Sequence, residues 1–114
     1  MQFLVSGEFI EAHIAGKPME EIFTWVEMVV HPSLDMMDKM VEAGKLTGGV
    51  AAGSRVLHVV LEAPSAEELG KTLRSFPIWG AMHWTVTPLQ TFRSAIEQDQ
   101  ASQKLARARV AARR

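Results

Sequence analysis

The sequence of 114 residues contains neither cysteine nor tyrosine, and aromatic residues make up only 7% of it. Without cysteine the chain can form no disulfide, no thiolate metal site and no cysteine nucleophile. No apolar run reaches the roughly 20 residues that a membrane-spanning helix needs. The opening residues MQFLVSGEF lack the basic start and the long apolar stretch of a secretory signal peptide. We therefore expect a cytoplasmic protein with no membrane partner.

Motifs for cofactors and metals are also missing. The stretch GGVAAGS, residues 48–54, has neither the glycine spacing of a dinucleotide-binding turn nor the Gly-Lys-Ser/Thr of a phosphate loop. The chain has no His-Glu-x-x-His, and its four histidines lie far apart in the sequence. We expect no cofactor and no metal, and we interpret the glycine-rich stretch as a small-residue strand and a hairpin.

Charge is distributed unevenly along the chain. Residues 1–103 carry seven basic and thirteen acidic side chains, whereas residues 104–114, KLARARVAARR, carry five basic side chains and no acid. A nucleic-acid groove would need positive charge on the body, and the body is acidic, so we expect no nucleic-acid partner. The basic end fits either a solvated helical tail or a segment that clasps an acidic patch on a neighbouring subunit.

Hydrophobic periodicity predicts four strands and four helices. The strands are expected over residues 2–10, 48–53, 55–62 and 81–89, and the helices over residues 19–30, 34–45, 66–76 and 90–110. Pro32 lacks a backbone N–H and disfavours helical geometry at His31, so a kink or short break is expected in HPSLD. Ser65 and Glu68 have the spacing of a capping box at the start of the third helix.

The order β-α-β-β-α-β predicts an α+β fold of the ferredoxin-like type, with an antiparallel sheet and an added C-terminal helix. We divide the chain into a domain over residues 1–89 and a C-terminal helix with its basic tail over residues 90–114. Two helices cover one face of such a sheet and leave the other face bare. A sheet from another copy is the usual cover, so a homo-oligomer is expected.

Strand alternation places one candidate site between the sheet and the helices. Arg55 and Trp84 alternate onto the face that should pack under the helices, with Trp79 nearby in the sequence. Glu27 and His31 are four residues apart, so they share a helix face. A histidine beside a carboxylate suits proton transfer near neutral pH, and Arg55 could bind a substrate carboxylate or an enolate oxygen. The competing interpretation is a surface Glu–His pair and a solvated arginine.

A second candidate site lies on the opposite, more polar face of the sheet. Glu8, His58 and His83 alternate onto this face from three different strands. The same three residues also fit a hydrated or hydrogen-bonded dimer interface, which is the interpretation we favour for them.

The stretch APSAEELGKTLRSFPIWGAMHWTVTPL, residues 63–89, resembles the muconolactone Δ-isomerase family. Its members show a small residue and serine that open a helix, then a Leu-Pro-aromatic turn, then a strand that ends in Val-Thr-Pro-Leu. With Gly53 and the order of elements, the similarity covers most of residues 2–89. The resemblance implies a subunit that forms closed oligomers of the dimeric α+β barrel kind. It also implies cofactor-independent proton shuttling on small lactones from aromatic catabolism.

The resemblance extends to individual positions of the candidate site. The family carries Gly-x-Tyr-x-Asn after the hairpin, where this chain has Gly-Ser-Arg-Val-Leu, so Arg55 replaces the tyrosine and Leu57 the asparagine. A functional glutamate of the family maps near residues 32–33, beside His31. The resemblance therefore implies that Arg55, Leu57 and His31 point into one pocket.

The leading hypothesis is a cofactor-independent isomerase, cyclase or lyase that acts by proton transfer on a small apolar carbonyl compound or lactone. His31, with Glu27, would move the proton, and Arg55 would stabilise the oxyanion. Trp79 and Trp84 would shape the apolar wall. Two alternatives stay open: a non-catalytic small-molecule-binding or accessory protein on the same scaffold, and a cofactor-independent oxygenase of an aromatic or polyketide substrate. Neighbouring genes for aromatic catabolism would favour the isomerase, and a cluster for secondary metabolism would favour a biosynthetic tailoring enzyme.

Overall fold

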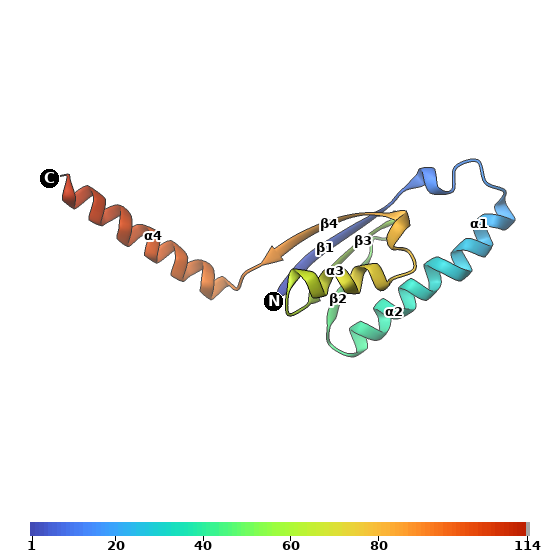
Figure 1. Cartoon of the computed structure of the whole chain (residues 1–114), viewed down its shortest axis with the longest axis horizontal. Helices are drawn as coiled ribbons and strands as arrows, with labels where there is room; N and C mark the ends of the chain where they lie inside the picture. The colour runs from blue at the N-terminus through green and yellow to red at the C-terminus, as the bar shows by residue number, and fades with distance from the viewer. Residues whose placement is uncertain (114) are drawn as a thin grey trace.

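A computed structural model describes residues 1–113 as one antiparallel sheet flanked by helices, with a final helix that projects from it (Figure 1). The strands are β1 (Gln2–Phe9), β2 (Leu46–Val50), β3 (Val56–Glu62) and β4 (Met82–Leu89). The helices are α1 (Met19–Trp25), the π-helical segment η2 (Val26–Val30), α2 (His31–Glu42), α3 (Ala66–Ser75) and α4 (Phe92–Ala112). Two 3-10 turns, η1 (Glu11–His13) and η3 (Trp79–Ala81), complete the chain. The predicted α+β, ferredoxin-like βαββαβ arrangement with an added C-terminal helix is confirmed.

The sheet has the strand order β2-β3-β1-β4, and every neighbouring pair is antiparallel. Val5 pairs with Val59 on one side and Val86 on the other, and it is fully buried beneath the helices. The next residue, Ser6, pairs with His58 on the open face. Because successive side chains in a strand alternate between faces, this register confirms the predicted division into a helix-covered face and a polar face.

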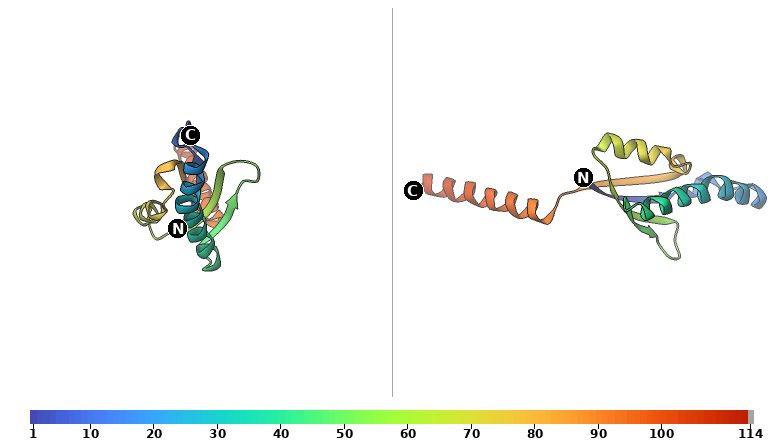
Figure 2. Two further views of the ribbon diagram at one scale, coloured as in Figure 1. Left: turned by 90° about the vertical axis from the view of Figure 1, so that its right-hand side faces the viewer. Right: turned by 90° about the horizontal axis from the view of Figure 1, so that it is seen from below.

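The helices α2 and α3 cover the same face of the sheet (Figure 2). The start of α3 is capped as predicted, because the Ser65 Oγ accepts a hydrogen bond from the Glu68 N–H at 3.2 Å. Leu69 and Leu73, one turn apart, are buried in the same core cluster as Met37 of α2. At about 25 cal/mol per Å² of apolar surface removed from water, such contacts are the main force holding both helices to the sheet.

The helix that contains Pro32 does not break in HPSLD, so the short break that the sequence allowed is absent. The backbone stays helical from α1 through η2 into α2, and the irregularity lies one turn earlier, where the His31 N–H donates to the Val26 carbonyl five residues back. A proline ring inside an α-helix clashes with the carbonyl four residues before it. A π turn widens the backbone at that point, so it accommodates Pro32 without ending the helix.

Ser33 ties this continuous helix to the segment that leads into β4. Its side chain is fully buried, and it is the one buried polar residue within the described range 1–113. The Ser33 Oγ donates to the Val29 carbonyl at 2.8 Å and accepts from the Ile78 N–H at 2.9 Å. A buried backbone N–H requires a partner, so this serine fixes the helix relative to the turn after α3.

The last helix, α4, extends away from the body on the side opposite α1 (Figure 1). None of its 21 residues is buried, and Phe92 at its start is 91% exposed. The radius of gyration is 20.3 Å, whereas a compact domain of about 100 residues has about 13 Å. Within residues 1–113 no helix combines the length and the apolar character needed to cross a membrane. The hydrophobic core therefore lies in the sheet and the helices before α4, and α4 itself contributes no buried residue.

Candidate functional site

A pocket of about 250 Å³ opens between the η2 segment and the end of the sheet where β1 stops and β3 starts. Val26 and Val30 of η2 face it from one side, and Leu57 of β3 faces it from the other. Ser54 and Arg55 are the only polar residues among those that line it in the described part of the chain. The site is therefore an apolar chamber with one cationic group at its edge.

Phe9 and Trp25 form the aromatic part of the pocket wall. Their ring centroids are 5.5 Å apart with the planes at 52°, a tilted arrangement that aromatic pairs favour. The imidazole of His13, on η1, lies 5.6 Å from the ring of Trp25. The turn after β1 thus brings aromatic and polar groups to the same end of the pocket.

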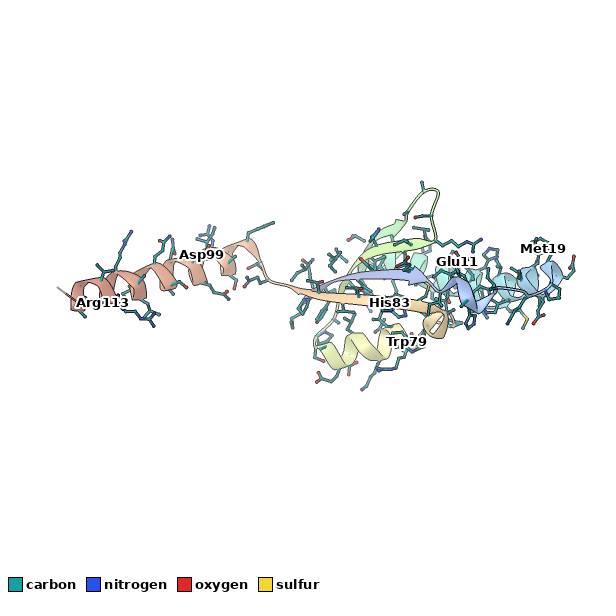
Figure 3. The ribbon with its side chains drawn as sticks, turned by 90° about the horizontal axis from the view of Figure 1, so that it is seen from above. Glu11, Met19, Trp79, His83, Asp99 and Arg113 are labelled. Atoms are coloured by element: carbon teal, nitrogen blue, oxygen red, sulfur yellow. The ribbon has the colours of Figure 1, made fainter. Side chains whose placement is uncertain are left out.

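Arg55 lies at the edge of the pocket, just before β3. Its guanidinium carbon is 5.7 Å from the centre of the Phe9 ring, within the range of a cation–π contact. Its Nη1 donates to both carboxylate oxygens of Glu11, at 3.0 and 3.2 Å. The Phe9 N–H also donates to the Arg55 carbonyl at 3.1 Å, so backbone pairing holds the two residues together. Figure 3 shows Glu11 between β1 and the helical rod, which is the continuous helix formed by α1, η2 and α2.

Among the predicted site residues, Arg55 and Leu57 do line this pocket. Trp79 and Trp84 lie elsewhere: they stack on each other with centroids 5.7 Å apart, and the Trp84 Nε1–H donates to the Trp79 carbonyl at 3.1 Å. Arg74 covers the Trp79 ring at 5.2 Å. Figure 3 places Trp79 in the turn after α3. The two tryptophans therefore form a packed unit outside the pocket lining.

Glu27 and His31, the predicted proton-transfer pair, are exposed on the η2–α2 rod and do not line the pocket. The residues directly before them in the chain, Val26 and Val30, do line it. The pocket side of the rod is thus apolar, and the pair lies on an adjoining, solvent-facing side.

The polar face of the sheet carries the second predicted group. The Ser6 Oγ and His58 Nδ1 are 3.1 Å apart, and Glu8 pairs with His83 across β1 and β4. All of these side chains lie on the face that α2 and α3 leave open. In residues 1–113 no three His, Asp or Glu side chains are close enough to hold a metal ion.

Most of the pocket lining, including Phe9 and Trp25, was not predicted as part of the site. Glu11 and His13, which contact Arg55 and Trp25 beside the pocket, were not predicted either. A signal for Glu11 exists in the sheet register. β1 and β3 are antiparallel, and Phe9 meets Arg55 at the end of their ladder, so a residue two positions beyond Phe9 comes within reach of Arg55.

Comparison with solved structures finds a protein of similar fold. The crystal structure of muconolactone isomerase at 3.3 Å resolution matches with a TM-score of 0.61, over 80% of this chain and 90% of that chain. This chain has the fold of muconolactone isomerase. The two sequences are 19% identical, so the similarity to muconolactone isomerase concerns the fold alone. The sequence matches no model of a known protein family, and no curated protein matches it.

Proposed function

We propose that the pocket binds a small, largely apolar carbonyl compound or lactone, and that the protein rearranges it by proton transfer without a cofactor. The reaction would be an isomerisation, a cyclisation or an elimination. The observation that carries this proposal is an apolar pocket of about 250 Å³ with a single arginine at its edge, on the muconolactone isomerase fold. Such a site can bind the apolar part of a ligand and direct its one polar oxygen to a fixed donor.

Arg55 supplies the electrostatic part of this mechanism. When a proton leaves the carbon next to a carbonyl, negative charge develops on the carbonyl oxygen. A preorganised N–H donor aimed at that oxygen lowers the barrier, because it stabilises the enolate more than the ketone. Leu57, Phe9 and Trp25 form the wall that orients the ligand. Trp84 supports this wall indirectly, because it packs over Gly7 next to the pocket-lining Met82.

In this proposal His31, assisted by Glu27, moves the proton at the edge of the pocket. Support comes from their place in the chain, since each directly follows a pocket-lining valine. Because both side chains are exposed, the step requires them to reach over the pocket edge or to be covered by another subunit.

A test uses a small β,γ-unsaturated lactone in D₂O, followed by proton NMR. Catalysis removes a proton from one carbon and returns a deuteron to another, so deuterium incorporation and double-bond migration appear together. We expect Arg55→Ala and His31→Ala each to abolish this exchange without lowering the melting temperature, because both side chains are exposed. Loss of folding with unchanged specific activity in the folded fraction would contradict the assignment.

A second candidate is a non-catalytic small-molecule-binding protein. The placement of Glu27 and His31 outside the pocket lining favours it. Ligand binding that is detected by calorimetry, with no exchange in D₂O, would select this function. Oxygen consumption with a hydroquinone-like substrate would instead select the cofactor-independent oxygenase.

We further propose that the protein is a homo-oligomer. Phe92, Leu105 and Val110 of α4 are 91%, 60% and 53% exposed, and no residue of this 21-residue helix is buried. Helices in proteins gain most of their stability from packing against other elements, so a partner surface for α4 is expected. The five basic residues at the end of the chain also complement the acidic body of another copy.

Light scattering tests the assembly. We expect a mass of at least two chains for the natural protein and a smaller mass for Phe92→Ser combined with Ile96→Ser. Gln100→Ser on the same helix is the matched control and should leave the mass unchanged. A monomer for all three proteins would contradict the proposal.

A further inference from the structure

The ion pair between Arg55 and Glu11 has an unusual geometry at the pocket edge. Both carboxylate oxygens of Glu11 accept from the same nitrogen, Nη1 of Arg55. In the described part of the chain, Nε and Nη2 of this guanidinium have no hydrogen-bond partner. An arginine carries five N–H donors in a planar fork, so most of them stay available for an oxygen of a ligand.

Glu11 also determines the net charge at the pocket edge, where a ligand would enter. Among residues 1–113, Arg55 is the only charged residue that lines the pocket, and the Glu11 carboxylate lies 3.0 Å from its Nη1. The rest of the lining is apolar apart from Ser54. The field of the arginine at the pocket edge is therefore largely cancelled before any ligand enters.

A carboxylate and an uncharged carbonyl respond differently to this arrangement. To enter an apolar chamber, a carboxylate must lose water, which costs far more than for a carbonyl unless an unopposed cation compensates it. Here the cation is already paired, and the Glu11 carboxylate repels a second anion. A carbonyl oxygen needs only a hydrogen-bond donor, which the unused side of Arg55 provides.

We propose that Glu11 is a selectivity residue that makes this pocket specific for uncharged carbonyl compounds over free carboxylates. It acts through Arg55, whose charge it neutralises and whose guanidinium it holds against the Phe9 ring. The inference rests on the proposed function of the pocket as a site for small carbonyl compounds. It excludes acids from the substrate class and leaves neutral ketones, esters and lactones.

Two probes of nearly the same shape test the proposal: cyclohexanecarboxamide, which is neutral, and cyclohexanecarboxylate, which is charged. Isothermal titration of the full-length protein gives the dissociation constant of each. We expect the natural protein to bind the amide more tightly. Glu11→Gln should strengthen carboxylate binding about fivefold, the typical upper worth of an exposed ion pair, and should change amide binding less than twofold. This gain should shrink as salt is added.

Two further variants separate selectivity from a merely structural role. Glu11→Asp keeps the negative charge, so the ratio of the amide affinity to the carboxylate affinity should stay as in the natural protein. Glu67→Gln, which removes another exposed carboxylate, on α3, should leave both affinities unchanged. Equal changes for both probes in Glu11→Gln, or tighter carboxylate binding by the natural protein, would overturn the inference while the pocket itself stands. Failure of every variant to bind either probe would overturn the inference together with the proposed function.

Discussion

Substitution of Ser33 by alanine is the sharpest test of how the pocket is held together. Ser33 is fully buried, and its Oγ is the acceptor for the Ile78 N–H at 2.9 Å. Ile78 itself lines the pocket. Alanine removes the acceptor and leaves a buried N–H without a partner, which costs about 1–3 kcal/mol.

The net effect can be worked out from these terms. Alanine has a better helix propensity than serine by about 0.5 kcal/mol, which partly offsets the lost hydrogen bonds. We therefore expect a loss of about 1.5 kcal/mol in the free energy of unfolding. For a domain of this size that corresponds to a fall of about 6 °C in the melting temperature and a drop of about 0.7 M in the urea midpoint.

Thr24→Ala is the matched control. Its Oγ1 donates to the Glu20 carbonyl at 3.0 Å, the same type of bond four residues back in the same helical rod, but at an exposed position. Both variants should be compared by urea unfolding at one protein concentration, because assembly would make stability depend on concentration. Ordinary surface substitutions change the free energy of unfolding by about 0.5 kcal/mol or less. If the losses measured for Ser33→Ala and Thr24→Ala differ by no more than this, the argument from the buried N–H fails.

Three further predictions concern the scaffold and the pocket. Gly48→Ala should destabilise the fold by about 3 kcal/mol in urea unfolding. Gly48 has φ +115°, and a Cβ there would collide with the His58 carbonyl oxygen. A Cβ at Gly49 meets open space, so Gly49→Ala should cost less than about 1 kcal/mol. Glu62→Gln should change the free energy of unfolding by less than about 0.5 kcal/mol, because its ion pair with the Met1 amino group is about half exposed on both sides; a larger loss would show that this pair is more than a surface contact. Trp25→Leu should weaken binding of the neutral amide probe about tenfold in calorimetry by removing the aromatic wall, and unchanged affinity would place the ligand elsewhere.

The scaffold follows from short-range patterns in the sequence. The alternation of Phe3 and Val5 with Leu4 and Ser6 predicts which face of β1 is buried, and the register confirms it. The Ser65 cap is equally local and is present in the structure. The effect of Pro32 is not local in this sense, because a helix can either break at a proline or widen before it. Which of the two occurs depends on tertiary contacts, such as the hydrogen bond from the Ile78 N–H to Ser33.

The site was less accessible to prediction, because it depends on how elements distant in the sequence come together. Arg55 could be placed at a pocket edge from strand alternation alone, and the structure puts it there. The choice among three tryptophans could not be made in this way. Trp25 reaches the pocket only because of the rotation of the helical rod, whereas Trp79 and Trp84 satisfy each other through a stack and a hydrogen bond.

The π turn limits where this chain can change in length. A π turn holds one residue more than a regular helical turn, so deleting one residue within 26–30 would restore a regular helix and leave the downstream faces nearly unrotated. Deleting or inserting a residue elsewhere in residues 22–34 would rotate everything downstream by about 100°. Leu34 would then leave the pocket, and Ser33 would lose the Ile78 N–H. We therefore expect length changes among natural relatives to occur within the π turn, in the β2–β3 hairpin and in α4, and to avoid the rest of residues 22–34.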